Sequence, residues 1–394
     1  MTDKNHQPEG EGRFEEEGRV ANLFEEMRIG TMTARNRIVR SATAESLATP
    51  AGGLTPELLG LYGQLAWGGA GTIITGYSFV VFEGKPSEGA LGMHDDSFLH
   101  QFRCLTDLAH ENGACIVAQL VYGGSKSKLS PDDPRRLAPA GVPGEDGAPN
   151  TSILGASAVV HPRTGLVPTE AAAADLDALA HAFGQAALRA RACGFDGVEV
   201  HAAHGYLLSQ FLSQRFNKRE DEYGQTLEGR ARLAVECVSA VRAAVGSDWP
   251  VLVKLNACDD WDDPTGARGG LSEDESARVA AWLVEAGASC IDVSGDWHAA
   301  SKGAPAGMPY FAGFGARLAR ELDAPVIVTG GWRDKATIEA HLANDGIAGV
   351  GMSRPLICEP DLPRRWQSGD CTPSACTGCG SCQKQVGIPC AVRG

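Results

Sequence analysis

The chain of 394 residues has neither a long hydrophobic run nor a concentration of positive charge. No apolar stretch approaches the roughly 18 residues of a membrane span, and residues 1–20 contain no apolar signal core. With 35 Lys plus Arg against 49 Asp plus Glu, the formal net charge is −14. Nothing resembles the basic stripe that a nucleic-acid partner needs. We therefore expect a cytoplasmic protein that partners neither a membrane nor a nucleic acid.

Glycine is abundant, at 49 residues, and the hydrophobic share of 43% and the charged share of 21% are typical of a globular protein. Short, nearly continuous apolar segments recur along the chain, as is typical of strands that are buried on both faces. They cover residues 37–42, 72–77, 115–120, 197–202, 251–256, 290–295, 326–331 and 349–354. Segments with helical periodicity lie between them, such as 95–112, 175–193, 227–245, 272–285 and 334–343.

This alternation predicts an α/β fold, a single (β/α)8 TIM barrel. An open doubly wound sheet is the alternative, but no G-x-G-x-x-G follows the first strand. The connection after the third strand, from Leu120 to Asp175, is long and rich in Gly, Pro and Asp, so we expect it to overhang the C-terminal face of the barrel. The expected organisation is a disordered acidic tail over 1–20, the barrel over 21–366 and a Cys-rich tail over 367–394.

Polar residues end several of the apolar strands, where barrels place their reactive groups. Gly330, Gly331 and Arg354 follow the last two strands, and backbone N–H groups with an arginine there are typical of a phosphate site. Gln119 and Lys254 end other strands. A Gln suits an imide-like edge and a Lys can stabilise a developing anion, so they indicate a bound polar ligand. A buried ion pair or a solvated rim is the alternative for these two side chains.

His201, His204 and Tyr206 follow the fourth strand. Three interpretations are open at this point: structural histidines, a metal-binding pair, or hydrogen-bond donors to a substrate oxygen. No Asp or Glu follows at metal-ligand spacing, which weakens the zinc interpretation. A metal-dependent barrel lyase or hydrolase stays as an alternative function.

The stretch HAAHGYLLSQFLSQRFNKREDEYGQTLEGRARL, which starts at His201, resembles the signature of the Old Yellow Enzyme family of FMN-dependent NAD(P)H oxidoreductases. Also similar are LFEEMRIGTMTARNRIVRSA, QL at 119–120, VLVKLNACD, and IVTGG with GMSRPL. The resemblance runs from Leu23 to about Trp366. It implies FMN as cofactor, NADH or NADPH as electron donor and a small-molecule substrate, with a homo-oligomer left open.

The resemblance implies a role for each strand-end residue. Gln119 would hydrogen-bond the flavin pyrimidine edge, and Lys254 would stabilise charge beside N1 and O2. The residues expected at the FMN phosphate are Gly330, Gly331, Ser353 and Arg354, and those against the ring are Ala42, Thr43, Ala44 and Tyr77.

The implied reaction reduces the C=C bond of an α,β-unsaturated carbonyl compound. His201 and His204 would hold the carbonyl oxygen while flavin N5 delivers hydride to Cβ, and Tyr206 would protonate Cα. Asp296-Trp297-His298 resembles a Trp-His pair of the dienoyl-CoA reductase branch, which makes His298 a candidate second acid.

Five of the 12 cysteines lie at or after Cys371. Thiolates spaced as Cys376-x2-Cys379-x2-Cys382, with Cys390 after them, are typical of a [4Fe–4S] or zinc site. Larger relatives of the dienoyl-CoA reductase branch carry such a cluster, although the spacing here is shorter. A flavin and iron–sulfur electron-transfer subunit is therefore a further alternative function.

Overall fold

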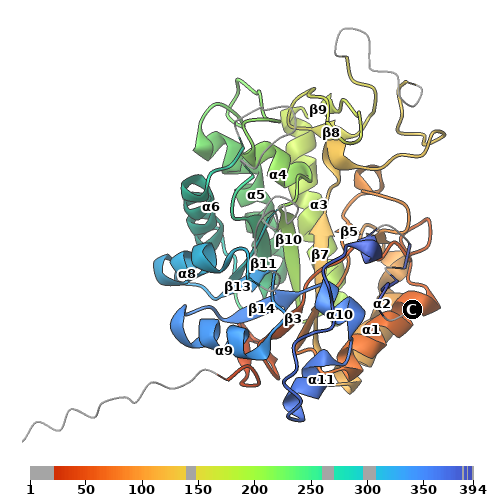
Figure 1. Ribbon diagram of the computed structural model, residues 1–394. Coiled ribbons are helices and arrows are strands. Elements are labelled where there is room, and N and C mark those ends of the chain that lie inside the picture. The colour runs from red at the N-terminus through yellow and green to blue at the C-terminus, as the bar shows by residue number, and fades with distance from the viewer. Residues whose placement is uncertain are drawn as a thin grey trace, which may run out of the picture.

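The computed structural model describes residues 22–138, 148–259, 270–295, 308–383, 386–387 and 389–392. Eight parallel strands form a closed ring at its centre (Figure 1). They are β3 (Ile38–Arg40), β4 (Thr72–Ile74), β7 (Cys115–Val121), β10 (Gly197–Ala202), β11 (Val251–Asn256), β12 (Cys290–Ser294), β13 (Val326–Thr329) and β14 (Gly349–Met352). The ring closes because β14 pairs with β3 and β10 pairs with β7. The predicted barrel is confirmed.

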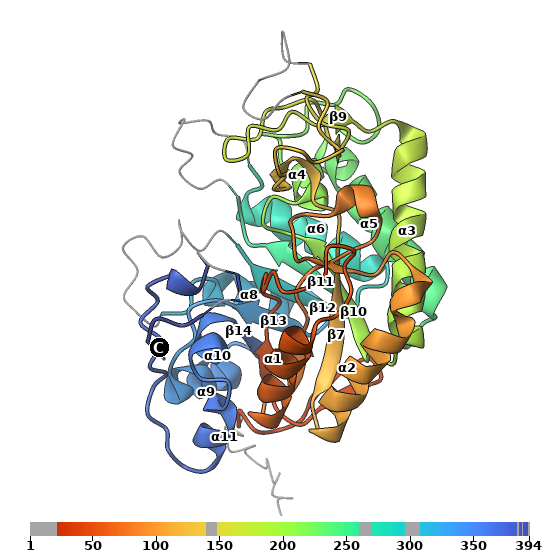
Figure 2. The same cartoon turned by 90° about the vertical axis from the view of Figure 1, so that its right-hand side faces the viewer.

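Helices cover the outside of the ring, with α1 to α3 lying outside β4, β7 and β10 (Figure 2). The helices are α1 (Pro56–Trp67), α2 (Leu99–Glu111), α3 (Ala173–Ala192), α4 (Leu207–Leu212), α5 (Leu227–Val245), α6 (Glu273–Glu285), α8 (Ala312–Glu321), α9 (Lys335–Asn344), α10 (Arg354–Cys358) and α11 (Leu362–Gln367). Local sequence sets their starts. Ser272 and Glu275 form a reciprocal capping box at α6, and the Thr55 hydroxyl accepts the Leu58 N–H at α1.

An antiparallel hairpin closes the N-terminal end of the ring. Its strands are β1 (Met27–Ile29) and β2 (Met32–Ala34). Their buried side chains share one apolar cluster with inward-facing residues of the barrel strands, namely Val39, Ile74, Val117, Leu252, Cys290 and Ile327. This floor leaves the C-terminal ends of the strands as the place for a site, as barrels use them.

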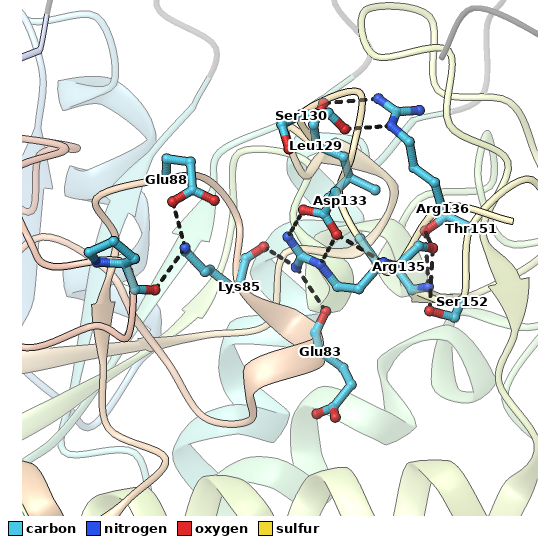
Figure 3. A network of polar contacts seen from close by, with 12 residues as sticks. Glu83, Lys85, Glu88, Leu129, Ser130, Asp133, Arg135, Arg136, Thr151 and Ser152 are labelled. Carbon is cyan, nitrogen blue, oxygen red and sulfur yellow. Dashed lines mark hydrogen bonds and ion pairs between the residues drawn. The ribbon is translucent and has the colours of Figure 1, made fainter. Parts of the chain in front are cut away.

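The first part of the long connection from β7 to α3 is held against the barrel by hydrogen bonds. Inside it, β8 (Leu154–Gly155) pairs with β9 (Thr169–Glu170) beside α4, at the upper end of the barrel in Figure 1. Arg135 makes a two-point ion pair with Asp133, at 2.9 and 2.8 Å, and donates to the carbonyl oxygens of Glu83 and Lys85 (Figure 3). A buried arginine with this many acceptors is fixed in place. Residues 139–147 lie outside the described part.

The last described residues cross the joint between the first and last barrel strands. Glu359, after α10, accepts hydrogen bonds from the Ser374 hydroxyl at 2.8 Å and the Ala375 N–H at 2.7 Å. Gly387 N–H donates to the Glu45 carbonyl oxygen at 2.9 Å. The expected tail over 1–20 lies outside the described residues. Among the helices that are described, none is both long and apolar enough to cross a membrane.

Candidate active site

A polar layer lies above the apolar floor inside the ring. Strand geometry explains it, because residues two apart on a strand face the same side. Gln119, Lys254 and Asp292 each follow an apolar floor residue by two positions, after Val117, Leu252 and Cys290. The layer consists of Ser41, Gln119, Glu199, Lys254, Asp292 and Thr329. This polar layer lies directly below the residues that follow the C-terminal ends of the strands.

Lys254 is the centre of this layer and is completely enclosed. Its Nζ atom lies 2.5 Å from Asp292 Oδ2, 3.5 Å from Glu199 Oε2 and 3.2 Å from Ser41 Oγ. Gln119 Nε2 donates to Glu199 Oε1 at 2.5 Å. The alternative considered for Gln119 and Lys254, a buried ion pair, is therefore present in the protein without a ligand.

Burial and the carboxylates act in opposite directions on Lys254. Burial disfavours its ammonium, but the charges of Asp292 and Glu199 outweigh burial and raise the pKa above its ordinary value. Lys254 is thus a fixed positive charge near the mouth of the barrel. Such a charge suits an electron-rich ligand edge.

His201 and His204 are joined by a hydrogen bond whose direction can be assigned. The Ala203 N–H donates to His201 Nδ1 at 3.3 Å, so the ring proton of neutral His201 is on Nε2. His201 Nε2 then donates to His204 Nδ1 at 3.4 Å, and His204 Nε2 donates to Ser294 Oγ at 3.0 Å. Burial lowers the pKa of both rings well below 6.5; the next cause is His204 for His201 and Lys126 for His204. Both side chains are therefore neutral donors.

The backbone at His204 is held in an unusual conformation. Its φ is 57°, in the left-handed region, and its N–H donates to Asn256 Oδ1 at 3.0 Å. Such strain in a non-glycine residue persists only where the surroundings impose it, which is common at functional sites. Sequence alone gave no sign of it.

Tyr206 lies directly after these histidines, at the start of α4. Its ring centroid is 4.9 Å from that of His201 and 5.6 Å from that of Tyr77. Burial, and then Tyr77, raise the pKa of Tyr206 well above 10, so its hydroxyl is protonated at neutral pH. The hydroxyl of Tyr77 lies 3.0 Å from Ser87 Oγ. Lys126 places its ammonium 4.8 Å from the centre of the Tyr206 ring.

The ends of β13 and β14 form a second corner suited to an anion. Gly330 and Gly331 have φ values of 125° and 89°, which L side chains rarely adopt. A Cβ atom on Gly331 would lie 2.0 Å from the Met308 carbonyl oxygen. Ser353 Oγ lies 2.8 Å from Thr43 Oγ1, and Arg354 starts α10 beside them. Only glycine fits this cradle, and its donor set suits a phosphate.

The remaining predicted residues are distributed as follows. Ala42, Thr43 and Ala44 follow β3 with Ala44 exposed, and Tyr77 follows β4. His298 lies outside the described residues. Within the described ranges, no group of three or more His, Cys, Asp or Glu is arranged to hold a metal ion. The Cys390 thiol lies close enough to that of Cys358 on α10 for a hydrogen bond.

The two carboxyl groups of the polar layer, those of Glu199 and Asp292, were not among the predicted site residues, and neither were Ser41 and Thr329. A signal for the two carboxyl groups exists, because each is the one charged residue in an otherwise apolar strand segment, GVEVHA and CIDVSG. A charged side chain in a buried strand needs a partner, and Lys254 is the matching cation. The neighbouring order of β10, β11 and β12 brings the three together.

Comparison with known proteins agrees with this geometry. Residues 22–372 match the NADH:flavin oxidoreductase / NADH oxidase family. The chain is 32% identical to a metal reductase of Desulforamulus reducens, covering 88% of this chain and 49% of the relative. It is 30% identical to the 4,4'-dithiodibutanoate disulfide reductase of Rhodococcus erythropolis, covering 94% and 95%. The chain spans about half the length of the metal reductase and of a similar NADH oxidase of Thermoanaerobacter brockii.

Solved structures share the fold. A 2-naphthoyl-CoA reductase superposes with a TM-score of 0.80 at 24% identity, covering 92% of this chain and 54% of that chain. An Old Yellow Enzyme homologue from Zymomonas mobilis gives a TM-score of 0.71 at 23% identity, covering 88% and 93%. The chain therefore belongs to the NADH:flavin oxidoreductase / NADH oxidase family of oxidoreductases, as its resemblance to Old Yellow Enzyme predicted.

Proposed function

We propose that the chain is an FMN-dependent NAD(P)H oxidoreductase that reduces the C=C bond of α,β-unsaturated carbonyl compounds. Family membership supports the flavin and the nicotinamide donor. The observation that carries the substrate class is the grouping of two neutral imidazole donors and one protonated phenol, His201, His204 and Tyr206, at the barrel mouth.

The residues present fit FMN. The glycine cradle with Ser353 and Arg354 would hold the phosphate, because it offers backbone N–H groups, a hydroxyl and a guanidinium. Gln119 and Lys254 would face the pyrimidine edge. The segment Ala42 to Ala44 and Tyr77 would lie against the ring. When bound, FMN supplies the hydride chemistry that no side chain here can perform.

The chain's own residues would polarise and protonate the substrate. The proton on His201 Nε2 is held by His204 in the free protein, so a carbonyl oxygen entering the site can replace that weak 3.4 Å contact. Neutral donors stabilise the charge that develops on that oxygen. Tyr206, kept protonated by burial, then supplies the proton to Cα.

A metal at the two histidines is less well supported. Nδ1 of His201 already accepts the Ala203 N–H, and the two rings stand at 88° and bond to each other. The described residues offer no third ligand. For the electron-transfer alternative, the described residues show no group of three or more thiols arranged as a metal site.

The direct test is an absorbance experiment on protein supplied with FMN. Under anaerobic conditions, NADH or NADPH should bleach the absorbance band that oxidised flavins show at about 450 nm. Adding 2-cyclohexenone should restore the band and produce the saturated ketone. Protein that does not bind FMN, or bleached protein that no enone reoxidises, would contradict the proposal.

A further inference from the structure

Glu199 is a titratable residue of the polar layer to which the proposed function gives no role. It lies on β10, with 0% of its surface exposed. Gln119 reaches it from β7 and Lys254 from β11. Asp292 of β12 lies close enough for its carboxyl group to hydrogen-bond that of Glu199. A carboxyl group this deep must be either fully paired or neutral.

The hydrogen bonds separate the two carboxyl groups. Asp292 receives two donors, Lys254 Nζ at 2.5 Å and Thr329 Oγ1 at 2.7 Å, so both of its oxygens are satisfied as a carboxylate. Glu199 receives one, from Gln119 on Oε1. Its Oε2 atom is buried without a hydrogen-bond partner, and Lys254 stands 3.5 Å away. Asp292 is therefore built to be ionised and Glu199 is not.

Charge balance leads to the same assignment. One ammonium lies between two carboxyl groups in a closed interior, so full ionisation would leave a net negative charge there. Two carboxylates also repel each other, whereas a carboxylic acid can donate to a carboxylate. A single proton on Glu199 removes both costs.

We propose that Glu199 is a positioning residue that holds a proton, and that its protonated form is the one that binds FMN. The proposal rests on the proposed function only in taking FMN as the ligand. With Glu199 neutral, Lys254 and Asp292 balance each other and Gln119 keeps its contact. With Glu199 ionised, the layer below the electron-rich pyrimidine edge becomes negative and opposes binding.

The surroundings of Glu199 support this assignment. Burial raises the pKa of Glu199 to about 8. The charge of Lys254 opposes this rise and that of Asp292 adds to it. Cys290, on the neighbouring strand, has its thiol pKa raised well above 9 by burial and then by these carboxylates, so it carries no charge. His201, two residues along the same strand, is neutral. Within the described part of the chain, Lys254 and Asp292 are the charged groups that act on Glu199.

The sign of the pH dependence follows. A ligand that prefers the protonated form takes up a proton on binding, and its affinity falls as pH rises through the pKa. The FMN dissociation constant of the FMN-free protein should be flat near pH 7 and rise by up to about tenfold per pH unit above 8. The charge of the FMN phosphate is constant over this range, because its second pKa is about 6.

Two variants test the assignment by fluorescence titration with FMN. Glu199→Gln is neutral at every pH, so its dissociation constant should match the low-pH value of the wild type and stay flat from pH 7 to 9.5. Asp292→Asn leaves Lys254 paired with Glu199 alone. That change should ionise Glu199 at lower pH and make FMN affinity depend on pH only below 7. Calorimetry in two buffers should show proton uptake near pH 8.5 for the wild type and none for Glu199→Gln.

Equal pH dependence in the wild type and Glu199→Gln would overturn the proposal, as would an unshifted profile in Asp292→Asn. Failure of the wild type to bind FMN at any pH would instead contradict the proposed function. The proton on Glu199 would then be measured without FMN, as a carboxylic acid C=O infrared band that titrates near pH 8 and is missing in Glu199→Gln. Absence of that band would also overturn the proposal.

Discussion

The Nε2 atom of His201 lies 3.4 Å from Nδ1 of His204, and the two rings stand at 88° to each other. Because His201 Nδ1 is taken by a backbone N–H, the pair points its protons in one direction, from His201 through His204 to Ser294. The tautomer of each ring, and hence the nitrogen that donates, is thus fixed before any substrate is present. Preorganised donors act on a developing oxyanion without paying for their own reorientation.

Replacing His204 by leucine should lower kcat/KM for enone reduction by about 10²- to 10³-fold, because one oxyanion donor is lost. Anaerobic flavin reduction by NAD(P)H should change much less. His204→Asn is the matched control, since Asn donates a hydrogen bond and tolerates the positive φ of 57° at this position. Stopped-flow measurement of the two half-reactions separates these effects, and equal losses in both would contradict the assigned role.

Tyr206→Phe should slow flavin reoxidation by an enone by about 10²- to 10⁴-fold, because the proton donor is removed. Tyr77→Phe removes only the neighbouring hydroxyl and should cost much less. In the wild type, burial keeps the pKa of Tyr206 well above 10, so its contribution to the rate should stay constant from pH 6 to about 10. A loss of rate in this range that Tyr206→Phe abolishes would show that the hydroxyl ionises earlier than expected.

Gly331→Ala should weaken FMN binding and lower the melting temperature. The new Cβ atom would meet the Met308 carbonyl oxygen at 2.0 Å, and the φ of 89° is strained for any L side chain, which costs of order 1–3 kcal/mol. Gly313→Ala on α8 is the control, because its Cβ meets nothing within 4 Å and alanine favours a helix. Thermal denaturation and FMN titration would measure both, and an unaffected Gly331→Ala protein would exclude a tight cradle.

His161 should make the protein sensitive to acid. Burial, followed by Lys126, Arg163 and Arg215, lowers its pKa to about 3, so the folded protein keeps the ring neutral while the unfolded chain binds a proton below about 6.5. Stability therefore falls as pH falls from about 6.5 towards 3, by roughly 1 kcal/mol per pH unit for this group.

The variant His161→Asn tests this dependence. Asn can still accept the Thr164 N–H that His161 Nδ1 accepts at 3.3 Å. The variant loses the stacking on Phe216 and should be less stable at pH 8. Its disadvantage should shrink as pH is lowered to 5 in urea titrations. A constant difference between variant and wild type would show that His161 is not held neutral.

The barrel could be predicted because its strands carry their own signal. A strand such as β11 is buried on both faces, so its sequence is apolar apart from Lys254 and the final Asn256. The β1–β2 hairpin and α1 were not anticipated. Three-residue strands are too short to show a period, and α1 contains Gly60 and Gly63, which weaken a helical pattern.

Those site residues that lie at the end of a single strand could be predicted from the sequence. His201, His204 and Tyr206 are close in sequence and were found together. Glu199 and Asp292 lie within their strands and not at the strand ends, so a search of the strand ends alone did not find them. For Lys254, the ligand-facing and ion-paired interpretations were both open, and only the position of Asp292 decides what it contacts in the free protein.

The β1–β2 hairpin fixes how molecules reach the polar layer. Met27 and Met32 pack into the floor of the barrel. Among the described residues this floor covers the N-terminal end of the ring, so we expect ligands to enter through the loops at the C-terminal end. A nicotinamide donor and an enone acceptor would then bind alternately at the same site. Steady-state rates should give parallel double-reciprocal lines, with each partner competing against the other at high concentration.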